Sequence, residues 1–275
     1  FALLMKARAD DRRLLADPDN PPRLNILSLQ ASQGLDAQAL HAALTAGHSP
    51  QASPRAPDAG FADTDLFPAT RPQMSLGEAA ALPAPGASTG LTQQAIAELL
   101  ATFEHAKTFG SLIQIGPQRL PSLREQLSIL KNAEASGDLY AQAAAKDLLP
   151  LVRQALVLGM QFDAVVANPP YMGSKYLTPV LKSYLKANYA GYEKDLFSAF
   201  MMRDLAFAKP TGQLGFMSPF VWMFISSYEE LRTHFIDHAT LTSLVQLEYS
   251  GFDGATVPIC TFTLAKQHVA QFVGS

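Results

Sequence analysis

The chain has 275 residues, of which 48% are hydrophobic and 16% charged, a composition that excludes intrinsic disorder and predicts a globular protein with a sizeable core. Its net charge of −3 excludes a strongly basic protein, and residues 151–275 carry nine Lys and Arg against nine Asp and Glu, so the main surface for gripping a nucleic acid is not expected here. The single cysteine, Cys260, excludes internal disulfides and a multi-cysteine metal site, and its strand-like surroundings favour a buried thiol.

Neither a signal peptide nor a membrane span is predicted. Residues 1–15 read as a helix that carries several charges, and the most apolar run, residues 214–225, is too short for a bilayer and contains Pro219. We therefore expect a cytoplasmic protein without membrane contact. Because the first residue is Phe1 rather than Met, the chain is also expected to be a piece of a longer protein.

The segments after the first helix alternate between extended and helical character. Residues 24–29 are a plausible short strand. Residues 35–90 are rich in Pro, Gly, Ser and Ala, which predicts a linker or an exposed loop. Residues 91–158 predict helices, with a capping box at residues 122–125 and a further helix that starts near Asp138.

Pro150 is expected to break or kink that last helix. We interpret residues 35–150 as a linker plus a helical insertion between two strands of one sheet. Two roles for the insertion remain open: a module that serves only packing, or a surface for DNA or a partner protein.

A buried strand that stops at two prolines is the most informative segment. Residues 162–167 include a continuous apolar run, typical of a strand covered on both faces, and Pro169 and Pro170 cannot donate to a ladder. Asn168 and Tyr171 are therefore expected on a stiff turn at the carboxyl end of a strand, the edge where open α/β sheets bind ligands.

The chemistry of this turn suits an amine. Asn168 offers an amide oxygen and Pro169 a carbonyl oxygen, so two fixed acceptors can hold both hydrogens of one NH₂ group and leave its lone pair free to attack an activated methyl group. Tyr171 offers a flat face for stacking a planar base. The alternative is an ordinary strand-to-loop turn, but a strand followed by Asn-Pro-Pro-Tyr favours the functional interpretation.

The carboxyl half continues with further regular elements. Thr178 and Pro179 predict the cap and first residue of a helix, and Asp195 is expected to cap the next one. The remaining expected elements are a strand at residues 213–218, a helix at 228–238, and two strands at 241–248 and 257–264, joined by a loop that contains Phe252.

Two side-chain groups are weaker candidates for sites. Lys175, Lys182 and Lys186, together with Tyr184 and Tyr189, could touch a DNA backbone, although an ordinary solvated face is the stronger interpretation. A second pair, His234 and His238, has the spacing of metal ligands on a helix, but no nearby Glu or Cys completes a site, so no metal is expected.

The ordered segments resemble a known family. Asn168-Pro169-Pro170-Tyr171 matches the catalytic motif of amino-group methyltransferases that use S-adenosylmethionine, and the order of the segments is similar to the N6-adenine DNA methyltransferases. The amino-acid sequence from Tyr171 to Lys175 and from Glu248 to Phe262 most resembles the PglX adenine methyltransferases of BREX phage-defence systems. The similarity covers about residues 160 to 265 and continues through residues 195–200, 209–216 and 248–258.

This resemblance implies a fold class and a domain organisation. We expect an α/β, Rossmann-like methyltransferase fold with a mostly parallel sheet, helices on both faces and an antiparallel terminal hairpin. Residues 24–29 would be its third strand, and strands one and two, with the Gly-rich cofactor loop, would precede Phe1, so the fold would be incomplete at the N-terminus. Residues 1–34 would then belong to the methyltransferase domain, residues 35–150 to the linker and insertion, and residues 151–275 to the catalytic half.

The resemblance also implies an activity and its residues. A methyl group would pass from S-adenosylmethionine to N6 of an adenine flipped out of double-stranded DNA, with other phage-defence proteins as possible partners. Asn168, Pro169 and Tyr171 would be catalytic, and Tyr171 and Phe252 would sandwich the base. Pro170 and Phe200 would line the cofactor. The alternative role for Phe252 is a hydrophobic plug over the hairpin, and the alternative role for Phe200 is ordinary helix core.

Two other functions remain open at this point. The same tetrapeptide occurs in methyltransferases that act on protein glutamine or on RNA bases, although a glutamine amide needs no double-sided stack. The chain could also be a non-catalytic assembly fragment, which contributes the base pocket but does not bind the cofactor alone.

Overall fold

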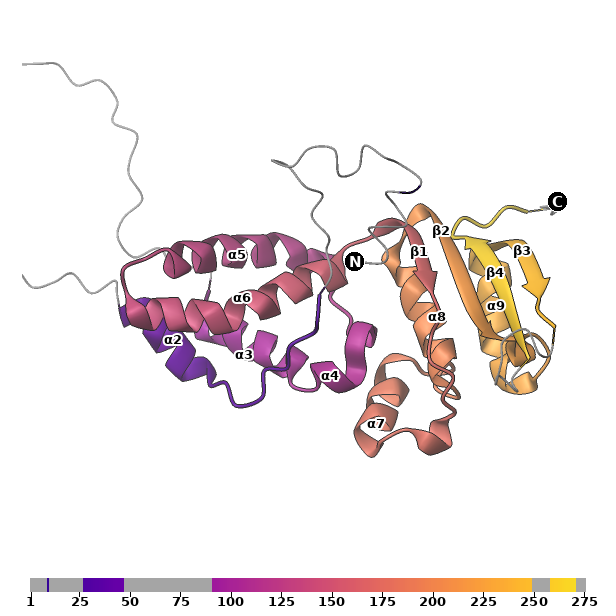
Figure 1. The fold of residues 1–275 in the computed structure, drawn as a ribbon, viewed down its shortest axis with the longest axis horizontal. Coiled ribbons are helices and arrows are strands. Elements are labelled where there is room, and N and C mark those ends of the chain that lie inside the picture. Colours follow the sequence, from indigo (N-terminus) through magenta and orange to yellow (C-terminus); the bar gives the residue numbers. More distant parts are fainter. Residues whose placement is uncertain (1–8, 10–26, 47–90, 249–257, 271–275) are drawn as a thin grey trace, which may run out of the picture.

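The computed structural model of the chain describes residues 9, 27–46, 91–248 and 258–270. In this part of the chain a group of helices precedes a four-stranded sheet that carries helices on one side (Figure 1). The helices are α2 (Ala37–Ala46), α3 (Gln93–Phe103), α4 (Ala106–Phe109), α5 (Leu120–Glu134), α6 (Leu139–Gly159), α7 (Pro179–Asn188), α8 (Leu196–Phe207) and α9 (Glu229–His238), and the strands are β1 (Phe162–Ala167), β2 (Ala208–Pro219), β3 (Thr240–Gln246) and β4 (Ile259–Ala265).

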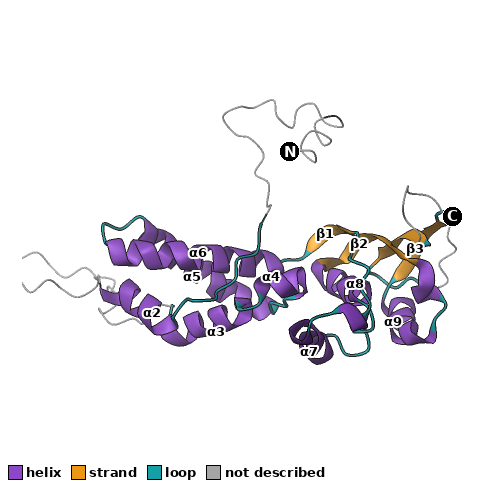
Figure 2. Cartoon of the chain, turned by 60° about the horizontal axis from the view of Figure 1, so that its bottom comes forward, coloured by secondary structure: helices purple, strands orange, loops and turns teal. Residues whose placement is uncertain are grey.

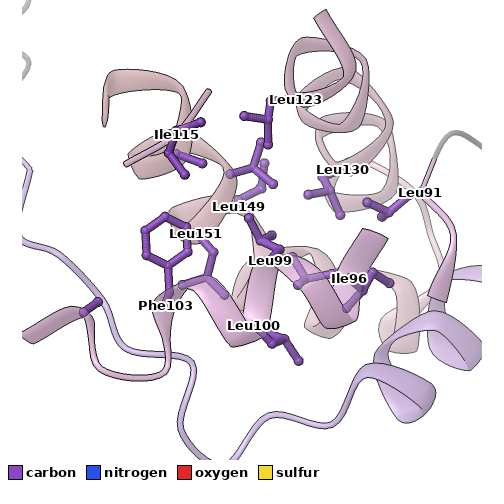
Figure 3. Packing of buried hydrophobic residues seen from close by; sticks show 14 of the residues in the cluster. Leu91, Ile96, Leu99, Leu100, Phe103, Ile115, Leu123, Leu130, Leu149 and Leu151 are labelled. Atoms are coloured by element: carbon purple, nitrogen blue, oxygen red, sulfur yellow. The ribbon is translucent and has the colours of Figure 1, made fainter. Parts of the chain in front are cut away.

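The amino-terminal helices pack around a core of their own. On α3, apolar residues recur every three or four positions and therefore share one buried face. Figure 3 shows this face meeting leucines of α5 and α6, and each large side chain buried in this way contributes about 1.5–3 kcal/mol. The central members of the cluster are Ile96, Leu99, Leu100, Phe103, Leu123, Leu130, Leu149 and Leu151.

The strand expected at residues 24–29 is absent from its described part, because residues 27–30 have no regular secondary structure. Here the side-chain amide of Gln154 on α6 takes the place of a neighbouring strand. Its Oε1 accepts a hydrogen bond from the backbone N–H of Gln30 at 2.8 Å, and its Nε2 donates to the Gln30 carbonyl at 2.9 Å. A buried side chain thus satisfies the peptide groups that a ladder would otherwise pair. The expected helix at residues 1–15 lies outside the described residues, apart from residue 9.

The helical region differs from expectation at three points. Residues 37–46 of the expected linker form α2. The expected capping box is wrong, since α5 begins at Leu120 and the Ser122 hydroxyl accepts from the Gln126 side chain instead. Helix α6 runs through Pro150 to Gly159 without a break, so it crosses the boundary expected at residue 150. Its start is as predicted, with the Asp138 carboxylate accepting from two backbone N–H groups.

The sheet has the strand order β1-β2-β4-β3. Strand β1 is parallel to β2, whereas β2–β4 and β4–β3 are antiparallel, so the terminal hairpin is confirmed but the described sheet is mixed rather than mostly parallel. The α/β class is confirmed. Strand β1 is the edge strand of the described sheet, and it has no ladder partner on its other side among these residues.

Within the described residues, helices cover only one face of this sheet. Helices α8 and α9 lie on the same side, as Figure 2 shows, where they bury Leu214, Phe216 and Phe262. On the opposite face Val166 is 84% exposed, and it lies beside Gly215 of β2. The alternation of strand side chains explains the difference, because Val165 and Ala167 point toward the helices and Val166 away from them. The prediction of helices on both faces is therefore not met in this part of the chain.

A buried arginine connects the two groups of elements. The Arg203 guanidinium on α8 donates to the carbonyls of Ser111, Ile113 and Leu158 at 2.7–2.8 Å. It also lies 3.8 Å from the centre of the Phe207 ring. These carbonyls come from the turn after α4 and from the last turn of α6, so one side chain of α8 holds the end of the helical group against the sheet.

The neighbouring Asp204 is buried beside this arginine, and its Oδ2 has no hydrogen-bond partner among the described residues. Burial raises the pKa of this carboxyl group to about 7, against an opposing effect of the Arg203 charge. A carboxyl group with a pKa near 7 is partly protonated at neutral pH.

This raised pKa predicts a pH-dependent stability. The pKa of Asp204 is higher in the folded chain than in the unfolded chain, so its contribution is fully present below about pH 4 and is lost as the pH rises through 7. The loss has an upper limit of ~4 kcal/mol. The Asp204→Asn variant should lose this decrease of the unfolding free energy with pH, which is the pH slope of stability, and should be more stable than the wild type at pH 8. Urea unfolding at several pH values from 5 to 8 measures both effects.

Asp163→Asn is the matched control. The pKa of the Asp163 carboxyl is lowered by its hydrogen bond to Lys209, so its titration falls below this pH window and the slope should stay as in the wild type. A wild-type slope in Asp204→Asn would contradict the assignment.

Candidate functional site

The expected site lies where several strand ends meet. Strand β1 ends at Ala167, paired with Phe216 of β2, so Asn168 follows at the carboxyl edge of the parallel pair. The antiparallel hairpin places the end of β3 and the start of β4 at the same edge, because Gln246 of β3 pairs with Cys260 of β4. The N–H of Phe220, just after β2, donates to the carbonyl of Pro258 at 3.3 Å, which fixes the start of β4 near the end of β2.

Two residues of the motif are joined by a hydrogen bond. The Tyr171 hydroxyl donates to the Asn168 Oδ1 at 3.0 Å. Asn168 is exposed and Tyr171 is 39% exposed, so the hydrogen-bonded pair lies at the surface of the described chain. Between them Pro169 is buried and Pro170 is exposed. A carbonyl oxygen has two lone pairs, so the Asn168 oxygen can accept one further hydrogen bond.

The turn is held by the start of α8. The Asp195 carboxylate accepts from the N–H of Met172 at 2.9 Å and, as the cap of α8, from the N–H of Phe197 at 3.4 Å. Two backbone hydrogen bonds of 3.0 Å flank this contact, from Leu196 N–H to the Met172 carbonyl and from Ser174 N–H to the Lys194 carbonyl. Two hydrogen bonds therefore hold Met172, the residue that follows Tyr171, and a third holds Ser174 two positions later.

The surroundings of Tyr171 are partly apolar. Burial raises the pKa of its hydroxyl, with a smaller contribution from Cys260. The Cys260 thiol is buried, as predicted, and burial raises its pKa as well, so it is expected to stay a neutral thiol near pH 7. Tyr171 therefore acts here as a neutral ring and hydrogen-bond donor, and the site offers acceptors rather than a strong base.

The other candidate residues divide into three groups. Phe252 lies outside the described residues, so its position against Tyr171 stays a prediction. Phe200 is half-buried on α8 against the cluster of Leu181 and Leu185, a position equally compatible with helix core. The hydroxyls of Tyr184 and Tyr189 both donate to the Leu112 carbonyl, so these tyrosines fasten α7 to the helical group and their hydroxyl hydrogens are already used.

No metal site is evident in the described part of the chain, where no group of three or more His, Cys, Asp or Glu side chains is arranged to hold an ion. His234 and His238 stack with ring centres 4.4 Å apart, and the ring of His238 contacts the His234 carbonyl. Nor does any described helix combine the length and apolarity needed to cross a bilayer.

Sequence reasoning found the motif but missed how it is held. Asp195 was expected only as a helix cap, yet its carboxylate also holds the Met172 N–H across 23 residues of chain. The only sign in the sequence is that Asp195 caps a helix shortly after the motif loop. A cap residue by itself does not reveal a hydrogen bond to a residue 23 positions earlier.

Comparison with known proteins supports one family. The family model described as "Eco57I restriction-modification methylase" matches residues 92–252. The adenine-specific methyltransferase BrxX of Escherichia coli O9:H4 (strain HS) is 32% identical over 98% of this chain and 20% of its own length. The adenine-specific methyltransferase PglX of Lacticaseibacillus casei (strain Zhang) is 26% identical over 66% of the chain and 15% of its own length.

A further relative is the type II restriction enzyme and methyltransferase RM.Eco57I of Escherichia coli, which is 26% identical over 56% of the chain and 16% of its own length. The chain thus spans a fifth or less of the length of these relatives.

The contact between Asp195 and Met172 predicts a local change in hydrogen exchange. Asp195→Ala removes the acceptor, so the Met172 amide should exchange about tenfold faster, whereas Asp195→Asn keeps an acceptor oxygen and should change it little. Hydrogen–deuterium exchange resolved for residues 168–176 measures this. Asp138→Ala, which removes the cap of α6, should leave that segment unchanged. Equal exchange in Asp195→Ala and the wild type would contradict the positioning role.

Proposed function

The chain belongs to the family of Eco57I restriction-modification methylases, and from this premise we propose that it carries the base-binding half of an adenine-N6 DNA methyltransferase. The observation that supports this reaction most strongly is the amide oxygen of the exposed Asn168, held by Tyr171 at the end of β1 and followed by the Pro169 carbonyl. Two acceptors at one position match the two hydrogens of an exocyclic amine.

In the proposed reaction the protein orients the amine. The Asn168 Oδ1 and the Pro169 carbonyl accept the two N–H hydrogens of adenine N6, so the nitrogen lone pair points away from them. The cofactor that family membership implies, S-adenosylmethionine, supplies an electrophilic methyl group on a sulfonium when bound. With that cofactor bound, the Asn168 and Pro169 oxygens would keep the lone pair directed at the methyl group, and one N–H proton would pass from these acceptors to water. Since no strong base is involved, orientation is the main contribution of these residues.

The base must leave the duplex before it can reach this turn, at a cost of a few kcal/mol. The ring of the partly exposed Tyr171 offers one stacking face for it. We propose that Phe252, in the loop that begins and ends at the same sheet edge, offers the opposite face. Stacking on an aromatic ring contributes ~1–3 kcal/mol per base, which offsets a large part of that cost.

The described residues fit only part of a cofactor site. Pro170 is exposed next to the acceptors and is compatible with a cofactor that approaches the end of β1. Phe200 is only half-buried and is compatible with lining the same ligand. Among the described residues, however, no strand leads through a Gly-rich loop into a helix, which is the arrangement that cradles nucleotide-like groups. The remainder of the cofactor site is therefore proposed to come from elsewhere.

Asn168→Ala tests the acceptor role. Loss of one preorganised polar group at a reacting atom typically costs 10²–10³ in rate, so we expect a fall of about that size in kcat. The measurement is N6-methyladenine in DNA by nucleoside mass spectrometry, for the 275-residue chain and for a longer protein that contains it. Asn188→Ala is the matched control, because the Asn188 side chain only donates to the Tyr184 carbonyl within α7.

The same assay separates the alternatives. Methylation by the longer protein but not by this chain would identify the chain as an assembly fragment of the enzyme. Methyl transfer to RNA or to a glutamine side chain, without transfer to DNA, would refute the proposed substrate.

Tyr171 provides a ring and a hydroxyl, and two substitutions separate them. Tyr171→Phe keeps the stacking face and loses the donor to Asn168, so kcat/KM should fall less than about tenfold. Tyr171→Ala also loses the face, and the loss of stacking predicts a further fall of about 10- to 100-fold. If both variants lost activity equally, the hydroxyl rather than the ring would carry the role.

A further inference from the structure

A small cavity lies between α7, the end of the motif loop and the segment that precedes α8. Its volume is about 270 Å³, and it is lined by Ser174, Lys182, Lys186, Glu193 and Lys194. The cavity combines three ammonium groups from two separate segments, since Lys182 and Lys186 belong to α7 and Lys194 directly precedes the cap of α8.

The position of these charges in the chain brings them together. Lys182 and Lys186 are four residues apart on α7 and therefore share one helix face. Like charges at this spacing repel each other, which destabilises a helix slightly unless an anion lies between them. None of the three lysines forms an ion pair in the described part of the chain, where the ion pairs are Arg119–Glu98 and Lys209–Asp163.

One acidic group accompanies the lysines. The Glu193 carboxylate lines the cavity, and its Oε2 is buried without a hydrogen-bond partner among the described residues. It cancels one of the three positive charges and leaves an excess of two, which still favours a monoanion. Glu193 and Lys194 also border a second, larger cavity with Glu229, Glu230 and Asp237, where the charge is mainly negative. The lysine cavity is therefore the side on which an anion is attracted.

The cavity is tied directly to the motif turn. The Ser174 N–H donates to the Lys194 carbonyl at 3.0 Å, so the motif loop and the segment before α8 form one wall together. Ser174 is three positions after Tyr171, so their Cα atoms can be at most about 11 Å apart. An anion bound here would lie close to whatever stacks on Tyr171.

We propose that this lysine cavity binds one backbone phosphate of the DNA strand that delivers its base to Tyr171. This inference rests on the proposed function and names the group of the substrate that the site holds besides the base. A phosphodiester carries a single negative charge and oxygen acceptors, which match the ammonium groups and the exposed Ser174. Its sequence-independent grip would set the register of the strand while the motif acts on the extruded base.

The test is DNA binding by the full chain as a function of salt. The triple variant Lys182→Gln, Lys186→Gln and Lys194→Gln is compared with the wild type by fluorescence anisotropy of a labelled duplex without cofactor. Loss of one phosphate contact should reduce the slope of log K against log salt by about 1 and weaken binding about tenfold at 0.1 M salt. The control, Lys107→Gln with Lys131→Gln and Lys146→Gln in the helical group, removes the same charge and should leave the slope unchanged.

Each other outcome decides against the cavity. An unchanged slope, an equal effect in the control, or no binding of DNA by the wild type would overturn the proposal. A slope reduced by about 3 would also overturn it, because the lysines would then contact three phosphates separately. A titration with inorganic phosphate identifies the source of the bound phosphate. If free phosphate binds the wild type and the triple variant equally, and the two still differ in DNA binding in its presence, the DNA backbone is the source.

The outcome is distinguishable from failure of the proposed reaction. If DNA binding depends on the lysines but no methylation is found, the proposed reaction is refuted and the phosphate site is supported. If the triple variant methylates DNA at the wild-type level and its salt slope is unchanged, the proposed reaction is supported and the phosphate site is refuted. Circular dichroism should show unchanged folding of the variant, since Lys186 and Lys194 are exposed and Lys182 is half-buried at the surface.

Discussion

The site depends on one hydrogen bond, which the backbone N–H of Met172 donates to the Asp195 carboxylate. Two consecutive prolines end β1 and stiffen the turn, but they cannot anchor it, because neither has an N–H to donate. The anchor is formed at the backbone N–H of Met172, just beyond Tyr171. Asp195 provides it while it also caps α8, so the turn and the helix are held by the same carboxylate.

Helix α8 therefore links three parts of the molecule. Its first residue contacts the motif loop, its middle packs under β1 and β2, and its penultimate turn carries Arg203. The Arg203 guanidinium replaces water for three carbonyls at the end of the helical group. A buried cation of this kind is costly unless its donors are paired, and here they are paired with groups that would themselves be unsatisfied. Together with the hydroxyls of Tyr184 and Tyr189, these contacts hold the end of the helical group beside α7 and α8.

Local patterns predicted the elements whose causes are local. The preferences of a few consecutive residues explain the Thr178–Pro179 start of α7, the Asp195 cap, the start of α6 near Asp138 and the end of β1 before Pro169. The family, the α/β class and the terminal hairpin were also predictable. The described residues of the strand expected at 24–29, residues 27–29, have no regular secondary structure, and the adjacent Gln30 pairs its peptide groups with the side chain of Gln154, more than a hundred residues later.

The same distinction holds for the site. The acceptors Asn168 and Pro169 are neighbours in sequence, so their chemistry could be read directly. The contact of Asp195 with Met172, and the meeting of Lys182, Lys186 and Lys194 in one cavity, arise only after α7 and α8 have packed. Helix α6 passing through Pro150 belongs to this group, since its packed face outweighs the loss of one backbone hydrogen bond.

The hydrogen bond between Tyr171 and Asn168 has a consequence for the thermodynamics of recognition. Because the hydroxyl already occupies one lone pair of the amide oxygen, part of the water around that acceptor has been displaced during folding rather than during binding. The amide is also held in one rotamer, so less side-chain entropy remains to be lost when a ligand arrives. A ligand that reaches this oxygen meets a partly dehydrated, oriented acceptor, and selectivity among amines then depends on geometry more than on the enthalpy of a new hydrogen bond.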